Sequence, residues 1–187
     1  MTLRSRRDDD AFAAFVAGRS AALHGAAYLM VGDRTLAQDL VQEALAKTYA
    51  ALPRLRDQNA VEAYTRKAIT TTAISWFRRK SWHGEVPTET LPERAAEATQ
   101  DHVAVKDWLW QGLGTLPPRQ RAAVVLRYYD DLTEAQTAAA LGCTVGTVKS
   151  QVSAALKNLR TQLGPDLQDL DQLFAPSTAM TGKVATP

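Results

Sequence analysis

Apolar residues recur every three or four positions along most of this chain, the spacing that gathers them on one side of an α-helix. A first helix is predicted from a cap at Asp10 to about Met30, where Gly32 stops it. A second helix, opened by Asp33, should end before Pro53, because a proline disfavours helical backbone in the residue before it. The inward faces predicted for these two helices consist of Phe12, Phe15, Val16, Leu23, Leu36, Leu40, Val41, Ala44 and Leu45.

A third helix is predicted to begin at a cap at Asn59 and to continue to a run of three cations, Arg78, Arg79 and Lys80. The periodicity then fails over about twenty residues, where a glycine, two prolines and spaced glutamates indicate a linker. The chain therefore divides after its third helix.

The C-terminal part predicts a short helix, a tight turn and a second helix. Pro117 and Pro118 suit the start of a preceding helix. Thr133 and Gln136 match a capping box, and Gly142 ends the short helix that follows. Thr144 is the predicted cap of the last helix, whose apolar arc comprises Val145, Val148, Val152, Ala155, Leu156 and Leu159. This arrangement is a helix-turn-helix.

Because strand signals are nearly absent, the predicted fold class is all-α, with two small helical domains joined by a flexible acidic linker. The predicted boundaries are 8–82 for the first domain, 83–100 for the linker, 101–161 for the helix-turn-helix domain and 162–187 for a C-terminal tail. Leucines and Phe174 in the tail have the spacing of a short amphipathic helix. That segment could dock on the C-terminal domain or make a regulatory contact, and residues 176–187 are expected to be disordered.

Charge is distributed unevenly over these 187 residues, although the net charge is only +2. Thirteen Lys and Arg face eight Asp and Glu between Met1 and Lys80, and six face three between Arg119 and Arg160. The segment between them is acidic. Two mildly basic modules flank an acidic connector, and this distribution favours a nucleic-acid partner more than the total charge does.

The sequence lacks the features of several classes of protein. The single cysteine, Cys143, allows no intrachain disulfide, and His24, His83 and His102 show no metal-ligand spacing. There is no phosphate-binding glycine loop and no nucleophile elbow, so we expect no enzyme activity, small-molecule substrate, metal or cofactor. No apolar run approaches the roughly 20 residues of a membrane span, which predicts a cytoplasmic protein without membrane insertion.

The last helix has a polar face opposite its apolar arc. Small and hydroxyl side chains there would let the backbone enter the major groove, and nearby cations would neutralise phosphates. The face consists of Gly146, Ser150, Ser153, Ala154 and Lys157, flanked by Lys149 and Arg160. These residues indicate a recognition helix, and the alternative is an ordinary solvated helix of a three-helix bundle.

Two stretches resemble a known family. Residues 116–156, LPPRQRAAVVLRYYDDLTEAQTAAALGCTVGTVKSQVSAAL, resemble the minus-35-binding domain of bacterial sigma factors. Residues 33–49, DRTLAQDLVQEALAKTY, resemble the sigma helix that docks on the polymerase clamp. Their order, and the absence of the extra domains of larger sigma factors, make roughly residues 8–161 similar to the extracytoplasmic-function group.

The resemblance implies a sigma factor that binds core RNA polymerase, recognises the minus-35 and minus-10 promoter elements and promotes DNA melting. It implies polymerase contacts by Asp39, Gln42 and Glu43. It implies minus-10 contacts by Arg56, Asp57, Gln58, Asn59, Arg66, Lys67, Thr71, Trp76, Arg78, Arg79 and Lys80. For the minus-35 element it implies Thr144, Gly146, Thr147, Lys149, Ser150, Ser153 and Lys157. Trp76 and its neighbour Phe77 are equally compatible with core packing.

This sequence departs from the family pattern at three positions. Thr71 stands where the family commonly has asparagine, and Gln151 and Ala154 stand where arginines are frequent. Fewer cations predict weaker minus-35 binding by the C-terminal domain alone. The resemblance also leaves room for an anti-sigma partner. The rival hypothesis is a helix-turn-helix transcription regulator that acts without replacing the sigma subunit, and binding to core polymerase would separate the two.

Overall fold

The computed structural model describes residues 6–82 and 107–163, and every regular element in these two ranges is helical, which confirms the all-α prediction. The N-terminal part contains α1 (Arg6–Val31), α2 (Arg34–Ala51), a short 3₁₀ turn (Leu52–Arg54) and α3 (Gln58–Trp82). As predicted, α1 stops at Gly32, whose φ of 81° suits a glycine. Asp33 caps α2, accepting a hydrogen bond from the Leu36 backbone N–H at 2.8 Å.

Two predicted caps are wrong. Asp10 lies inside α1, which already begins at Arg6, because the residues before Asp10 continue the helix. At α3 the capping carboxylate belongs to Asp57, which accepts from the Ala60 N–H at 2.8 Å, and Asn59 lies in the first turn. Aspartate and asparagine are both good caps and stand two positions apart here, so local sequence alone did not choose between them.

The C-terminal part contains α4 (Asp107–Thr115), α5 (Pro118–Val124), a π-helical turn (Val125–Tyr129), α6 (Glu134–Leu141) and α7 (Val145–Leu163). The predicted capping box is present: the N–H of Gln136 donates to the Thr133 hydroxyl, and the N–H of Thr133 donates to the Gln136 side chain. Gly142, with φ 63°, ends α6. Thr144 caps α7 through the Thr147 N–H at 3.2 Å. These bonds confirm the helix-turn-helix.

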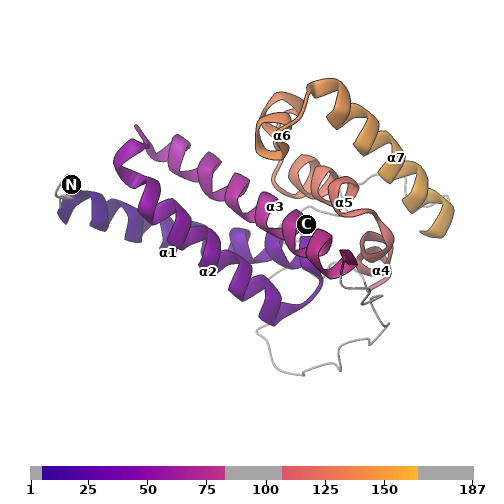
Figure 1. The fold of residues 1–187 in the computed structure, drawn as a ribbon, viewed down its shortest axis with the longest axis horizontal. Coiled ribbons are helices and arrows are strands. Elements are labelled where there is room, and N and C mark those ends of the chain that lie inside the picture. Colours follow the sequence, from indigo (N-terminus) through magenta and orange to yellow (C-terminus); the bar gives the residue numbers. More distant parts are fainter. Residues whose placement is uncertain (1–5, 83–106, 164–187) are drawn as a thin grey trace, which may run out of the picture.

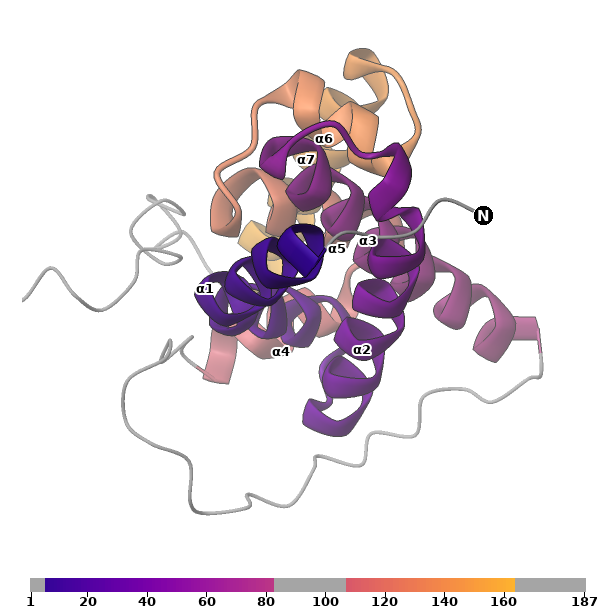
Figure 2. The ribbon, with the colours of Figure 1, turned by 90° about the vertical axis from the view of Figure 1, so that its left-hand side faces the viewer.

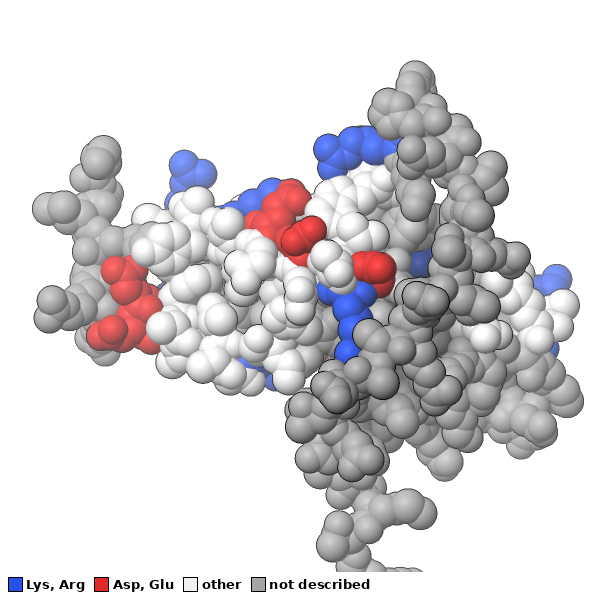
Figure 3. Space-filling view, turned by 90° about the horizontal axis from the view of Figure 1, so that it is seen from below, with Lys and Arg blue, Asp and Glu red and all other residues white. Residues whose placement is uncertain are grey.

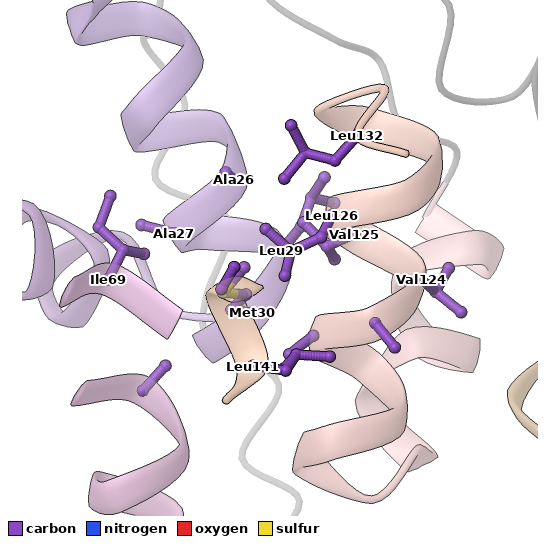
Figure 4. Close-up of a cluster of buried hydrophobic side chains, with 14 of the residues drawn as sticks. Ala26, Ala27, Leu29, Met30, Ile69, Val124, Val125, Leu126, Leu132 and Leu141 are labelled. Atoms are coloured by element: carbon purple, nitrogen blue, oxygen red, sulfur yellow. The ribbon is translucent and has the colours of Figure 1, made fainter. Parts of the chain in front are cut away.

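The two sets of helices pack against each other. The C-terminal helices lie beside α1 and α3, as the two ribbon views show (Figures 1 and 2). Side chains of α1, among them Leu29 and Met30, belong to the same buried cluster as Val125 and Leu126 of the π-helical turn (Figure 4). The hydrophobic core is therefore continuous across the two halves.

Arg121 of α5 joins the halves at their centre. It is 7% exposed and donates to the Met30 carbonyl oxygen at the end of α1, 3.0 Å away, and to the Gly114 carbonyl near the end of α4. Its guanidinium carbon lies 5.2 Å from the centroid of the Phe77 ring on α3. Burial lowers the pKa of Arg121 to about 10, so the side chain stays charged at neutral pH. A single cation therefore links three helices.

Two further contacts close the junction. Asp130 lies 3.5 Å from the Nε of Arg66 on α3, and burial raises the pKa of Asp130 to about 6 despite that cation. Tyr129 packs on Gly25 of α1, where an added Cβ would lie only 2.8 Å from the ring carbon Cζ. Burial and the Asp130 charge raise the pKa of Tyr129. The junction thus has specific polar and steric matches.

None of the helices in residues 6–82 and 107–163 is both long and apolar enough to traverse a lipid bilayer. The predicted linker and most of the predicted tail lie outside these residues. The domain boundaries proposed from the sequence remain a prediction.

Candidate nucleic-acid interface

The outer face of α2 carries the three residues predicted to dock on a partner. Asp39 and Gln42 are exposed, and Glu43 is half-buried. The Glu43 carboxylate pairs with Lys47 at 2.6 Å, and Lys47 also donates to the Thr72 hydroxyl of α3 at 2.9 Å. Glu43 is therefore held in place, whereas Asp39 and Gln42 extend from the helix into solvent.

Leu36 belongs to this face, contrary to the sequence prediction that it points inward. It is 44% exposed. Residues 36, 39 and 43 follow the spacing of one helix side, so the leucine lies beside Asp39 and Glu43. The sequence pattern missed it because Leu36 stands at the edge of the apolar arc formed by Leu40, Val41 and Ala44. An exposed leucine among acids makes this face suitable for a protein partner.

The first four residues predicted to contact the minus-10 element, Arg56 to Asn59, lie at the start of α3. Arg56 and Asp57 form the connection before α3, while Gln58 and Asn59 are the first residues of the helix. All four side chains are exposed. Asp57 already accepts the Ala60 N–H, so one oxygen of its carboxylate is used for capping.

On α3 the predicted DNA contacts separate into two groups. Lys67, Thr71 and Arg78 are exposed and lie on one side of the helix, at intervals of four and seven residues. Tyr64 precedes them by one turn on the same side and is 37% exposed. Tyr64 is not among the minus-10 contacts predicted from the sequence, although it stands seven residues before Thr71 and so shares its side of the helix. We name these four residues the α3 stripe.

Arg66, Trp76 and Phe77 face the interior instead. Arg66 pairs with Glu62 at 2.6 Å in addition to Asp130, and its side chain is only 15% exposed. Trp76 packs on the hydrophobic core, and Phe77 lies against Arg121. Of the cationic run at the end of α3, Arg78 and Arg79 are exposed, and the Lys80 side chain lies outside the described residues.

The polar face of α7 is open along its length. Gly146, Lys149, Ser150, Ser153 and Lys157 are exposed, as is the capping residue Thr144, and Thr147 is half-buried. The hydroxyl groups of this face bond locally: Ser150 donates to the Thr147 carbonyl, and the hydroxyls of Thr144 and Thr147 lie 2.9 Å apart. Lys149 lies 3.5 Å from Glu134 on α6 with both side chains well exposed, so this pair is weak. The seven predicted residues thus lie together.

Val145 departs from its predicted place in the apolar arc. It is 38% exposed, whereas Val148, Ala155 and Leu159 are fully buried. Its neighbours Thr144 and Gly146 are exposed as well, so the first turn of α7 is open to solvent. An exposed valine there could contact the methyl group of a thymine.

One further face of the molecule is seen from below in Figure 3. On the face shown in Figure 3, uncharged side chains predominate, and acidic and basic groups lie in small separate clusters. Within residues 6–82 and 107–163 no group of His, Cys, Asp and Glu is arranged to hold a metal ion.

Family models match both halves. The model described as Sigma-70 region 2 matches residues 15–83, and the one described as Sigma-70, region 4 matches residues 106–159. The first contains α2 and α3, and the second contains α6 and most of α7. The candidate surfaces on α2 and α3 therefore fall within one recognised unit, and the surface on α7 falls within the other.

Similar proteins cover most of the chain. An RNA polymerase sigma-E factor of Streptomyces coelicolor is 40% identical over 81% of this chain and 85% of its own length. The sigma factor SigV of Bacillus subtilis is 29% identical over 73% of this chain and 81% of its own length. Among solved structures, the sigma factor RpoE in complex with the anti-sigma factor NepR from Bartonella quintana has a TM-score of 0.67 at 23% identity, covering 82% of this chain and 96% of that one. CnrH in complex with the cytosolic domain of CnrY has a TM-score of 0.60 at 21% identity, covering 86% and 91%.

Proposed function

This chain belongs to the extracytoplasmic-function group of the sigma-70 family of RNA polymerase sigma factors. We propose that three of its surfaces, on α2, α3 and α7, bind different parts of the transcription complex. The protein binds core RNA polymerase and recognises promoter DNA for transcription initiation. We infer that it performs no catalytic step of its own and that it acts in the cytoplasm, where the polymerase is. The observation that supports the division is the separation of an acidic face on α2 from exposed cations and hydroxyls on α3 and α7.

The outer face of α2 would dock on the polymerase. Asp39 and Gln42 offer acceptors at its exposed edge, and Leu36 adds apolar area that can be buried on binding. Lys47 holds Glu43 by a charge-assisted bond and is itself bonded to α3, so the face is preorganised. A partner surface rich in arginine and lysine with an apolar centre would match it.

The α3 stripe and the loop before it would hold the melted minus-10 strand. Gln58 and Arg78 are twenty positions apart, so at 1.5 Å per residue they span about 30 Å along α3, enough for several extended nucleotides. Tyr64 supplies a ring for stacking on a base, Lys67 and Arg78 supply cations for phosphates, and Thr71 supplies a hydroxyl. Arg66 could contact a phosphate of this strand only if its ion pair with Asp130 were broken.

The open face of α7 would enter the major groove at the minus-35 element. Lys149 and Lys157 can neutralise phosphates, and Ser150 and Ser153 can reach phosphates or base edges. Val145 would add an apolar contact at the leading turn. With few cations on this face, we expect weak duplex binding by this unit alone, and tight binding only when the polymerase links the two DNA contacts.

An anti-sigma factor is a further proposed partner. It is supported by the similar solved structure in which the sigma factor RpoE is bound to the anti-sigma factor NepR. Such a partner would cover the α2 face, since that is where the polymerase must bind.

The test is reconstitution with bacterial core polymerase. We expect a stable complex that initiates on promoter DNA, and we expect Asp39→Lys to lower affinity for the core by about tenfold or more, because it places a cation in a face selected for cationic partners. Asp10→Lys, which makes the same change at an exposed position of α1, should alter affinity by less than about twofold. Duplex binding without any complex would favour the helix-turn-helix regulator instead.

A further inference from the structure

A shallow hollow of about 260 Å³ lies on the C-terminal helices, beside the face of α7 proposed for DNA. Its apolar floor includes Val148, Val152 and Leu156 of α7. Three cations surround it: Arg127 from the π-helical turn, and Lys149 and Arg160 from α7. Neither Val152 nor Leu156 is fully buried, so the core does not cover this strip.

The lining of the hollow matches an acidic amphipathic segment in its chemistry. Exposed Val145 stands seven residues before Val152 on the same side of α7, so the apolar strip extends along the helix. An apolar strip bordered by three cations would bury leucines at its centre and pair carboxylates at its edges. Glu134 is the one acid lining the hollow, and it pairs only weakly with Lys149.

The chain itself contains such a segment directly after α7. The sequence from Asp166 to Phe174 reads DLQDLDQLF, with three aspartates interspersed among Leu167, Leu170, Leu173 and Phe174. Leu167, Leu170 and Phe174 have the spacing of one helix side, which matches the strip in length and character. Gly164 and Pro165 lie between α7 and this segment, and both residue types favour a reversal of the chain after a helix.

We propose that residues 166–174 fold back onto this hollow, with the leucines over Val152 and Leu156 and the aspartates beside Arg160 and Lys149. The lengths agree: residues 166–174 and the α7 strip from Val152 to Arg160 are each nine residues long, which span about 12 Å in a helix. Arg160 is one turn from the end of α7, so the returning segment needs no further residues to reach its first cation.

This docking would restrain DNA binding. Lys149 and Ser153 line the hollow and also belong to the face of α7 proposed for the minus-35 element. Aspartates beside Lys149 and Arg160 would compete with phosphates for the same cations. The segment therefore acts as a competitor supplied by the chain itself, and polymerase-linked promoter binding would displace it.

A paramagnetic label tests the docking in the full chain. With Cys143→Ser and a nitroxide on Gln172→Cys, we expect the methyl signals of Val148 and Val152 to broaden and those of Leu40, in the N-terminal half, to stay sharp. Leu167→Asp with Leu170→Asp should abolish the broadening. Thr178→Asp with Thr181→Asp, which adds the same charge beyond the segment, should leave it unchanged. Equal broadening in the two variants would overturn the proposal, and broadening that rises with protein concentration would assign the hollow to a second copy of the chain.

A second measurement tests the competition and rests on the proposed role of α7. The probe is a fluorescent 20-base-pair duplex of random sequence at low salt. The Leu167→Asp, Leu170→Asp chain should bind it about threefold or more tightly than the Thr178→Asp, Thr181→Asp chain, because two cations of α7 are released at equal net charge. Equal affinities would overturn the competition. Docking and DNA binding can fail separately, since the methyl signals do not depend on DNA.

Discussion

The helices α3 and α7 both carry residues proposed to contact DNA, but they differ in how much of their polar surface is used inside the protein. On α7 the candidate residues point to solvent and bond mainly within their own helix. On α3 the stripe is open, while Arg66 pairs with Asp130 and Phe77 packs on Arg121. A peripheral helix can therefore change its surface without cost to the fold. A central helix such as α3 uses part of its polar surface in the junction of the two halves, which leaves a smaller part open for the proposed DNA contact.

This difference predicts that weakening the junction should affect α3 and leave the α7 face intact. The junction depends on three contacts from the C-terminal half: Arg121, Asp130 and Tyr129. Each of these residues can be substituted separately, and the expected changes in the free energy of unfolding differ in size and sign.

Arg121→Ala should have the largest effect. It removes a buried cation bonded to the carbonyls of Met30 and Gly114 and packed on Phe77. The buried Met30 carbonyl and the partly buried Gly114 carbonyl lose their donor, so we expect the free energy of unfolding to fall by about 3 kcal/mol. Arg119→Ala, an exposed position of the same helix, should change it by less than about 0.5 kcal/mol. Urea denaturation of the two variants measures both, and similar losses would show that Arg121 does not hold the junction.

The ionisation of Asp130 should make the free energy of unfolding depend on pH. Burial raises its pKa from 3.8 to about 6, so the folded protein binds this proton more tightly than the unfolded chain. Its stabilising contribution is therefore complete below about pH 4 and is lost as pH rises through 6, a difference of about 3 kcal/mol. Arg66 and Arg19 oppose the rise in pKa and Glu62 adds to it.

Asp130→Asn isolates this contribution. The variant should unfold at higher denaturant than the natural chain at pH 7, and the difference should shrink toward pH 4. Comparing the two chains cancels the titration of other carboxylates. A variant that is less stable at pH 7 would mean that the pair with Arg66 outweighs the cost of burying the charge.

Gly25→Ala should have a smaller effect. The new methyl group would overlap Tyr129, and the ring must move, which costs about 1–3 kcal/mol and is partly offset by the better helix propensity of alanine. Gly18→Ala in the same helix has nothing within 4 Å and should stabilise the protein by up to about 1 kcal/mol. Thermal unfolding distinguishes them, and equal shifts in Tm would argue against close packing at Tyr129.

The smallest effects concern single cations on the two DNA faces. Lys157→Gln should weaken duplex binding and reduce its salt slope by about one, because one phosphate contact is lost. Lys67→Gln should leave binding to a minus-35 duplex unchanged and reduce strand opening at the minus-10 element, detected by permanganate reactivity in the polymerase complex. A loss of duplex binding in both variants would contradict the division between α3 and α7.

Much of the architecture follows from local sequence. Asp33, the Thr133 and Gln136 pair, and Gly142 set helix boundaries through bonds or backbone angles formed within a few residues. The outward face of α7 followed from spacing alone, since a helix at the edge of the protein buries one side only. The identities of the two units came from residues 33–49 and 116–156, within the ranges that the family models match.

The two burial predictions that are wrong, for Leu36 and Val145, share a cause. Leu36 and Val145 have apolar side chains at positions that the helix period assigns to the core, yet no neighbouring element covers them. Arg66 pairs with Asp130 of the C-terminal half, and Trp76 packs on the hydrophobic core, which the sequence had left open beside a DNA contact. Hydrophobic periodicity states which side of a helix is apolar, but not where the surrounding helices end.

The sequence by itself determined the helices, the caps at Asp33, Thr133 and Thr144, the helix-turn-helix and the family, because these depend on interactions between residues close in the chain. Only the tertiary structure decided that the two halves share one core, that Arg121 and Asp130 join them, and that the predicted DNA contacts of α3 divide into an open stripe and an inward-facing group. Those outcomes depend on pairs such as Arg66 with Asp130, which are far apart in sequence and are brought together only when the helices pack.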